Sequence, residues 1–457
     1  MKVYEPGSFR DPSGVVFYES GSVFRELASA TRDFFQSQDY WKFLDRGVAE
    51  GRVLPSFPVS SPSGEFLIRQ ERLPFYTHSY EWSFGMLREA ALLTLDLQRD
   101  CMESGFSLKD ASAFNIAFVN GQPKFVDVLS FVKSPESQGW PAYRQFCQSF
   151  LFPLLMESHL GFDSRSVLKS HLAEVPIRII AGMIQPWHWP LPGVFKEVVL
   201  QNLLERHFGQ DAELVEKSAS AVSIPRKKVE ANLLRLRKIV ESLRPPKLSS
   251  TWATRYERDH SYTADETAVK SAFLERVLSR RKPARLLDLG CNSGAFTVIA
   301  ANHAQTTLGI DLDPGVVDLA HAKAKAKSSR ASFAVADLAN PSPAMGWGLV
   351  ERHSLLDRMG ADFFLALALV HHLRVSAKIP FERIIQQLKA LGPDGIVEWV
   401  DPADPAVAKL MALQAGPFED FKWENFRRIL ESNFELREIV ELGGGKRKLC
   451  HISVSQR

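Results

Sequence analysis

The chain has 457 residues, of which 45% are hydrophobic and 24% charged, and its formal net charge is +3. The composition is ordinary for a globular protein, and at roughly 100–200 residues per domain this length predicts two or three domains. So small a net charge does not by itself favour nucleic acid or an acidic membrane as a partner.

The cysteines and the apolar runs indicate the compartment. The four cysteines lie far apart, with neither zinc-type nor disulfide-framework spacing, at Cys101, Cys147, Cys291 and Cys450. The first ten residues contain no apolar signal core. The apolar run 363–370 is much shorter than the roughly 20 residues that span a bilayer. We therefore expect a soluble, cytoplasmic protein with reduced cysteines, no metal site and no membrane partner.

The first half contains three polar residues at kinase-like spacing. A helix is predicted at 81–104, and Asp110 and Asn115 follow it five residues apart. Asp127 comes after a hairpin whose turn is Asn120-Gly121. This arrangement resembles the core of kinase-type phosphotransferases. The resemblance implies that Asp110 is a base and that Asn115 and Asp127 bind metal.

Other parts of a kinase are missing from this half. Leu108-Lys109 replaces the His or Arg that often precedes the first Asp, and no glycine-rich phosphate loop is visible upstream. The nearest candidate for the strand lysine is Arg69. Alternatively, Asp110 and Asn115 cap a helix or turn, Asp127 ends a strand, and the region serves substrate recognition or docking.

An amphipathic helix is predicted at 225–243, where apolar residues recur at spacings of four and three. Pro245-Pro246 stop this helix. We place the domain boundary there, with an α+β domain at 1–245, for substrate recognition or of kinase-like fold, and a second domain at 246–457. The helix carries basic residues that would suit RNA, although a solvated face explains them as well: Arg226, Lys227, Lys228, Arg235, Arg237 and Lys238.

Strands alternate with helices in the second half, which predicts a parallel sheet covered on both faces. Strands are predicted at 285–289, 307–311, 332–337, 361–370, 394–400, 434–442 and 447–455. Helices are predicted at 264–280, 295–303, 314–328, 375–391 and 421–432. Because Gly443-Gly444-Gly445 joins the last two strands as a hairpin turn, the sheet should end with an antiparallel edge strand.

A glycine-bearing turn follows the first of these strands. Asp288 precedes Gly290, and Gly294 opens the next helix. A dinucleotide site would favour Gly-x-Gly-x-x-Gly, whereas an acid before the first glycine suits a ligand with an ammonium group and no pyrophosphate. Asp311 ends the second strand, where it can accept from both ribose hydroxyls. Asp337 ends the third, where it can accept from an adenine amino group.

This layout resembles the class I S-adenosylmethionine-dependent methyltransferases over about 250–457. Within them it is similar to a bacterial two-domain family that includes host-range nodulation proteins. The resemblance implies a Rossmann-like seven-stranded sheet and S-adenosylmethionine as cofactor. The implied cofactor-binding residues are Asp288, Gly290, Cys291, Asn292, Gly294, Asp311, Leu312, Asp337, Leu338 and Tyr262. Lys270 is a further candidate for the methionine carboxylate, with a role on the helix surface as the alternative for it and for Tyr262. Asn292 stands where glycine is commoner, but Asn tolerates positive φ.

Two segments are candidates for contact with the acceptor. His371 and His372 follow the fourth strand, which in this fold faces the transferred methyl group, so a neutral imidazole there could take a proton. Alternatively, the pair only caps the strand and orients substrate. The long segment between the third and fourth strands contains Trp347, Glu351 and Arg352, which either contact substrate or pack within a surface loop.

The leading hypothesis is a methyltransferase acting on an oxygen or nitrogen of an unidentified acceptor, which is a small molecule, a glycan, a protein or an RNA. One alternative is a bifunctional or kinase-like enzyme that binds ATP and magnesium in its first domain. The other is a non-catalytic S-adenosylmethionine-binding module for a protein or RNA partner. The oligomeric state stays open.

Overall fold

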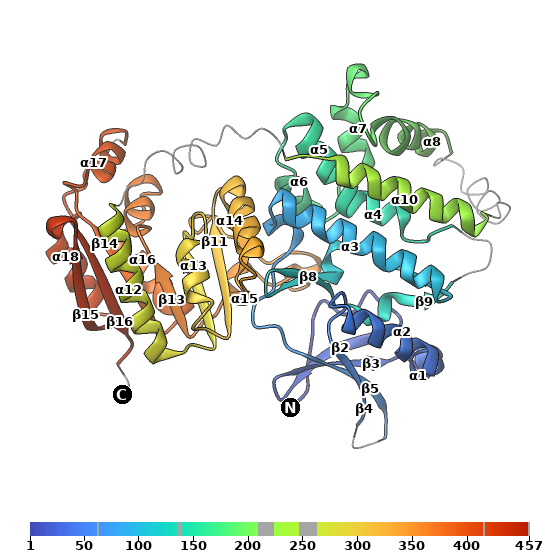
Figure 1. Ribbon diagram of the computed structural model, residues 1–457, viewed down its shortest axis with the longest axis horizontal. Coiled ribbons are helices and arrows are strands. Elements are labelled where there is room, and N and C mark those ends of the chain that lie inside the picture. The colour runs from blue at the N-terminus through green and yellow to red at the C-terminus, as the bar shows by residue number, and fades with distance from the viewer. Residues whose placement is uncertain (62–63, 135–138, 209–223, 246–262, 415, 456–457) are drawn as a thin grey trace.

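The computed structural model describes residues 1–61, 64–134, 139–208, 224–245, 263–414 and 416–455, and Figure 1 shows two parts of the chain side by side. The N-terminal part begins with a five-stranded antiparallel sheet in the order β1-β2-β3-β5-β4. Its strands are β1 Val3–Tyr4, β2 Gly14–Glu19, β3 Ser22–Leu27, β4 Ser56–Ser60 and β5 Phe66–Glu71. Two helices, α1 Arg32–Gln36 and α2 Gln38–Ala49, connect β3 to β4.

The predicted helix and hairpin of the first half are both present. The helix is α3, Phe84–Glu103. The hairpin pairs β7, Ile116–Val119, with β8, Gln122–Phe125. Its turn residues Asn120 and Gly121 have φ angles of 52° and 70°, the positive values that a two-residue hairpin turn requires. A second antiparallel pair joins β6, Phe106–Leu108, to β9, Phe131–Lys133.

The rest of the N-terminal part is helical. Its helices are α4 Tyr143–Phe146, α5 Phe152–Leu160, α6 Arg165–Ser170, α7 Ile177–Met183, α8 Gln201–Phe208 and α10 Arg226–Ser242. Helix α10 is the predicted amphipathic helix, and its apolar stripe is buried: Val229, Leu233, Leu236 and Val240. The proposed boundary near 245 adjoins residues 246–262, which lie outside the described residues, so the boundary stays a prediction.

The C-terminal part is a seven-stranded sheet in the order β12-β11-β10-β13-β14-β16-β15. Its strands are β10 Arg285–Leu289, β11 Thr306–Asp311, β12 Ser332–Val335, β13 Phe363–Ala366, β14 Asp394–Val400, β15 Glu435–Leu442 and β16 Arg447–Ser453. The first five run parallel, and the β15–β16 hairpin adds the antiparallel pairs. The predicted α/β sheet with an antiparallel edge strand is therefore confirmed.

Helices cover both faces of this sheet, as Figure 1 shows. They are α12 Ala264–Arg281, α13 Ala295–Ala300, α14 Pro314–Ala326, α15 Leu355–Arg358, α16 Phe381–Leu391, α17 Pro405–Ala412 and α18 Trp423–Glu431. The predicted strand 361–370 and the predicted helix 375–391 were both too long. Strand β13 ends at Ala366, and α16 starts at Phe381 because Pro380 precedes it with a fixed φ and no N–H.

The two parts share a hydrophobic core and a polar seam. One buried cluster contains residues of both, including Leu87 on α3 and Val317 on α14. The Asp318 carboxylate of α14 accepts hydrogen bonds from Ser83 Oγ at 2.6 Å and from the backbone N–H of Gly85 at 2.7 Å, at the start of α3. This seam holds the N-terminal part against the β12 side of the sheet. No helix among the described residues has the length and apolar character to cross a bilayer.

Candidate functional site

The turn after β10 has the backbone geometry that the glycines suggested. Gly290, Asn292 and Gly294 all have positive φ, at 71°, 48° and 76°. A Cβ at Gly294 would lie 2.8 Å from the Phe333 ring, and one at Gly290 would lie 3.2 Å from Leu369. A side chain at Gly294 would clash with the Phe333 ring, and one at Gly290 would be strained by the positive φ and tight against Leu369. Asn292 adopts a conformation that Asn tolerates.

Three strand-end acids lie along one edge of the sheet, because β10, β11 and β12 are adjacent and parallel. Asp311 holds the turn directly: its Oδ2 accepts from the Asn292 backbone N–H at 2.9 Å, and its Oδ1 accepts from the Asp313 N–H at 3.0 Å. Asp337 accepts from the Ala339 N–H at 2.8 Å. Burial raises the pKa of Asp311.

Asp288 lies deeper than the other two acids. Its side chain is buried and accepts a hydrogen bond from Thr297 Oγ1 at 2.6 Å. Burial raises the pKa of Asp288 to about 6, against the opposing hydrogen bond of Thr297 and the charge of Lys270. The sequence prediction did not include Thr297. Its position in the first turn of α13, close to the strand-end acid, could have identified it as a partner of Asp288.

The other predicted cofactor residues are distributed around this edge. Cys291 is buried beneath the turn, whereas Leu312 is exposed at the end of β11. Leu338 is partly buried against the core that lies under β12. Tyr262 lies outside the described residues.

His371 and His372 lie just beyond β13, at the same edge. Their ring centroids are 4.2 Å apart. His371 is buried, and its Nδ1 has no hydrogen-bond partner among the residues that the structure describes. Burial lowers the pKa of His371 well below its ordinary value, and nearby His372 and Arg447 act in the same direction. Burial also lowers the pKa of His372. Both imidazoles are thus favoured in the neutral form.

A buried ionic network near His371 was missed by the sequence prediction. Lys270 of α12 donates to Glu398 of β14 at 2.6 Å, and Arg447 of β16 lies 3.5 Å from the same carboxylate. Arg447 also pairs with Asp404 at 2.9 Å. Lys270 thus has a protein partner, where the sequence suggested the methionine carboxylate. Residues 128 positions apart form this ion pair, so no local pattern could reveal it.

The predicted substrate segment lies at the seam between the two parts. Arg10 Nε donates to Glu351 Oε1 at 2.6 Å, and the hydrogen bonds of Arg10 lower the pKa of Glu351 to about 2. Arg352 lies over the Phe114 ring, 4.0 Å from its centroid. Trp347 is exposed, while its backbone N–H donates to Glu351 at 2.9 Å. The structure therefore brings residues of both parts to this segment.

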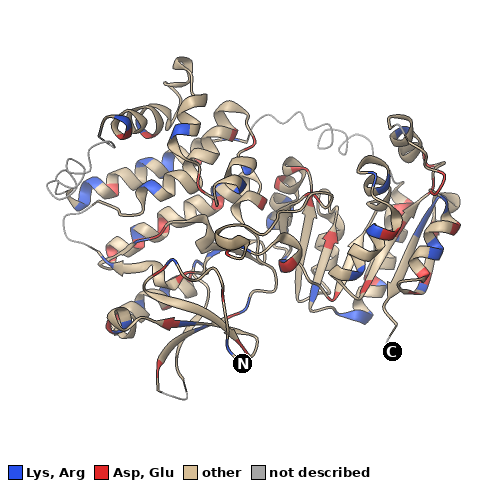
Figure 2. Cartoon of the chain, turned by 180° about the vertical axis from the view of Figure 1, so that it is seen from behind, with Lys and Arg blue, Asp and Glu red and all other residues tan. Residues whose placement is uncertain are grey.

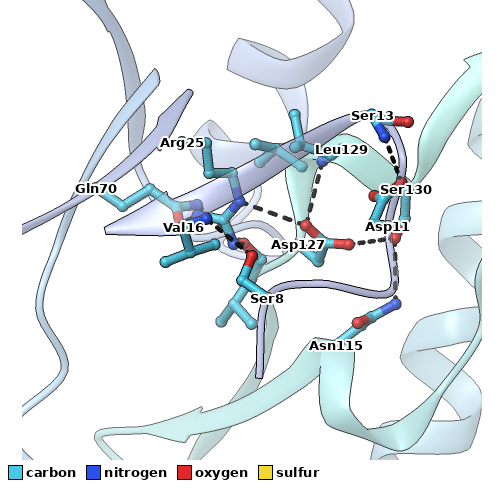
Figure 3. A network of polar contacts seen from close by, with 12 residues as sticks. Ser8, Asp11, Ser13, Val16, Arg25, Gln70, Asn115, Asp127, Leu129 and Ser130 are labelled. Carbon is cyan, nitrogen blue, oxygen red and sulfur yellow. Dashed lines mark hydrogen bonds and ion pairs between the residues drawn. The ribbon is translucent and has the colours of Figure 1, made fainter. Parts of the chain in front are cut away.

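The kinase-like residues of the N-terminal part form a closed polar network (Figure 3). Arg25 of β3 points to Asp127, with its Nε 3.4 Å from Oδ1, and also contacts Gln70. Ser130 Oγ donates to Asp127 Oδ2 at 2.6 Å and accepts from Asn115 Nδ2 at 3.2 Å. The strand residue whose guanidinium reaches Asp127 is thus Arg25. Arg69, the nearest sequence candidate for the strand lysine of a kinase, is exposed and lies over the Phe57 ring.

Asp127 has protein partners on both carboxylate oxygens: Oδ1 lies 3.4 Å from Arg25 Nε, and Oδ2 accepts from Ser130 Oγ. The metal-binding role that the resemblance implied for Asn115 and Asp127 stays a prediction. Asp110 accepts the Ser112 backbone N–H at 2.8 Å, which is the turn-capping role that the sequence left open. Within the described ranges, no group of three or more His, Cys, Asp or Glu side chains could hold a metal.

The sheet order and the turn after β10 are those of a methyltransferase domain, and residues 262–429 match the family model described as "Methyltransferase domain". The chain is also 31% identical over 452 residues to nodulation protein NoeA of Rhizobium meliloti (strain 1021). That match covers 97% of this chain and 94% of NoeA. The chain therefore belongs to the NoeA family of bacterial S-adenosylmethionine-dependent methyltransferases.

Two solved structures are similar to parts of the chain. N-methyltransferase NodS from Bradyrhizobium japonicum WM9 has 17% identity and a TM-score of 0.31, covering 42% of this chain and 98% of NodS. Magnesium protoporphyrin IX methyltransferase (ChlM) from Synechocystis PCC 6803, with bound SAH, has 18% identity and a TM-score of 0.32, covering 45% of this chain and 95% of ChlM. The family assignment rests on the match to NoeA.

Proposed function

We propose that this chain transfers the methyl group of S-adenosylmethionine to an oxygen or nitrogen of an acceptor, at the carboxyl edge of β10–β13. The observation that carries the proposal is the juxtaposition of a turn with glycines at Gly290 and Gly294, three strand-end acids and a buried histidine at that edge. When bound there, the cofactor supplies an electrophilic methyl group. The protein's own residues supply position and a proton acceptor.

In this proposal the turn and the acids hold the cofactor. Gly290 and Gly294 let the backbone approach the methionine part, because a Cβ at either position would meet neighbouring side chains. Asp311 accepts from the ribose hydroxyls, and a carboxylate retains acceptor capacity beyond the two backbone N–H groups it already binds. Asp337 lies on the adenine side, and Asp288 holds the helix that follows the turn through Thr297.

His371 is the proposed proton acceptor. Its Nδ1 is buried without a partner in the described structure, and its lowered pKa keeps the ring neutral near pH 7. A neutral imidazole can take the proton that an oxygen or nitrogen nucleophile loses on methylation. The acceptor approaches past His372, and Trp347 and Arg352 contribute to its recognition.

The N-terminal part then serves acceptor recognition in the cytoplasm, without phosphotransfer. The Arg25–Asp127 ion pair supports this assignment, because it occupies the carboxylate that a kinase gives to magnesium. A thermal-shift measurement with ATP and magnesium discriminates the two functions. A shift that disappears in Asp127→Ala would restore the kinase-like alternative.

Two measurements test the proposed reaction. Calorimetry should detect S-adenosylmethionine binding to the wild type and none to Gly290→Arg, because a side chain there meets Leu369 and strains a turn with positive φ. Lysate metabolites and macromolecules should gain label from isotope-labelled S-adenosylmethionine when the wild type is added. An unlabelled lysate despite tight cofactor binding would favour the non-catalytic module.

A further inference from the structure

An apolar surface runs from the end of α7 to α8, on the part of the molecule far from the methyltransferase sheet (Figure 1). Trp187 is 71% exposed, Phe195 is 50% exposed and Leu203 is 55% exposed. The ring centroids of Trp189 and Phe195 lie 5.8 Å apart. This contact connects the tryptophans after α7 with the π-helical segment Phe195–Leu200, which continues into α8. Single exposed apolar residues are ordinary, but contiguous ones mark an interaction site.

Basic residues border this apolar surface. Helix α10 reaches the π-helical segment that precedes α8, where Arg235 of α10 pairs with the buried Glu197. At the start of α10, Arg226, Lys227 and Lys228 are exposed, and none has an ion pair among the described residues. Figure 2 shows several Lys and Arg positions, in blue, along this helix.

Acidic residues only partly balance these charges. Glu230 is exposed next to the basic run, whereas Glu205 lies 3.4 Å from Arg144 and Glu241 lies 3.1 Å from Arg237. Arg206, on α8, is exposed and adds a positive charge on the apolar side. The surface therefore combines exposed tryptophans and leucines with unpaired cations.

We propose that this surface, residues 187–206 with the first turn of α10, docks the enzyme on an anionic lipid bilayer. Tryptophan is enriched at the boundary between lipid and water. Each Lys or Arg near an anionic surface contributes about 1 kcal/mol. The prediction of no membrane partner rests on the lack of a spanning run and on the small net charge of the whole chain. Surface docking requires no spanning run and depends on the charge of one surface.

The chemistry of the surface favours lipid over the other occupants. Planar rings such as Trp187 would also suit base stacking, but an RNA site has no use for the exposed aliphatic chains beside them. Leu200, Leu203 and Leu204 are such chains, and they can insert among lipid tails. A protein interface is depleted in lysine, whereas Lys227 and Lys228 lie beside this apolar surface.

Flotation of the full-length protein with vesicles tests the proposal. The wild type should float with phosphatidylglycerol–phosphatidylcholine vesicles, remain behind with pure phosphatidylcholine, and dissociate as salt is raised, because salt screens surface charge. Trp187→Ser and Lys227→Glu/Lys228→Glu should each weaken binding about tenfold or more, the second by reversing two charges.

Matched variants control for exposure and charge. Trp347→Ser removes a tryptophan that is 75% exposed, and Lys323→Glu/Lys327→Glu reverses two exposed charges at the C-terminal end of α14. Both controls should bind vesicles like the wild type. The proposal is overturned if the wild type does not float, or if the controls lose as much binding as the test variants. If the wild type does not float, retention on RNA would show that the surface binds RNA. Self-association that Trp187→Ser abolishes would show instead that the surface binds a second copy of the chain.

Discussion

At the scale of single residues, two neighbouring acids have different roles: Asp311 is a proposed cofactor ligand, and Asp313 is a helix cap. Asp311 holds the turn and faces the proposed ribose position, whereas Asp313 caps α14 by accepting from the Gly315 N–H at 2.8 Å. We expect Asp311→Ala to weaken S-adenosylmethionine binding about tenfold to a hundredfold, because hydrogen bonds to a charged group contribute roughly 1.5–3 kcal/mol. Calorimetry measures this change.

The matched control is Asp313→Ala, two residues further on. It should keep the cofactor affinity and lose about 1 kcal/mol of folding stability, as the loss of an N-cap does. Equal losses of affinity in the two variants would show that Asp311 acts only through the structure of the turn.

His371 predicts a particular pH dependence. Because its pKa lies well below the ordinary value in the folded protein, the ring stays neutral at pH values where an ordinary histidine, with a pKa of about 6.5, would be protonated. The rate of methyl transfer should therefore hold as pH falls through 6.5 and decline only lower. His371→Asn should lower kcat about a hundredfold, within the usual range for a lost general base, with cofactor affinity retained.

The control for this prediction is His372→Asn. Its ring is next to His371 but is not the proposed proton acceptor, so it should affect acceptor KM more than kcat. If His371→Asn keeps the wild-type kcat and pH profile, His371 only orients the acceptor.

At the scale of elements, one carboxylate joins helices α3 and α14. Asp318 accepts from Ser83 Oγ and from the Gly85 N–H, in the first turn of α3, where the helix dipole also favours a negative charge. We expect Asp318→Ala to lower the free energy of unfolding by about 1–3 kcal/mol, the cost of leaving buried donors without a partner. Urea denaturation measures it, and Lys323→Ala, exposed on the same helix, should change stability by less than about 0.5 kcal/mol.

The elements were predictable where the local pattern is strong. Strands 285–289 and 394–400 and helix 225–243 appear nearly where the apolar periodicity places them. The segment after β13 was not predictable in this way, because its apolar run continues past the strand into a turn. There Ala368 has a φ of 49°, which apolar character does not reveal.

At the scale of the whole molecule, the shared core couples the two parts. Leu87, Phe118, Val317 and Phe333 belong to one buried cluster, and Arg358 pairs with the buried Glu81 across the seam at 2.6 Å. We therefore expect calorimetry to record one unfolding transition, which S-adenosylmethionine moves to higher temperature as a unit. Hydrogen exchange should show protection of α3 and the β7–β8 hairpin on cofactor binding.

Gly290→Arg supplies the control, since a variant that does not bind the cofactor should show neither the temperature shift nor the protection. Two separate transitions, with only the second raised by cofactor, would contradict the coupling.

The sequence by itself determined the methyltransferase half, because its information is local: a strand, a turn with positive φ at Gly290, Asn292 and Gly294, and an acid at each strand end. It also placed the Asn120-Gly121 hairpin. Only the tertiary structure decided that Arg25 neutralises Asp127, that Glu398 pairs with Lys270, and that Arg10 reaches Glu351. These ion pairs join residues far apart in the chain, and their partners are selected by burial and packing, which no spacing pattern encodes.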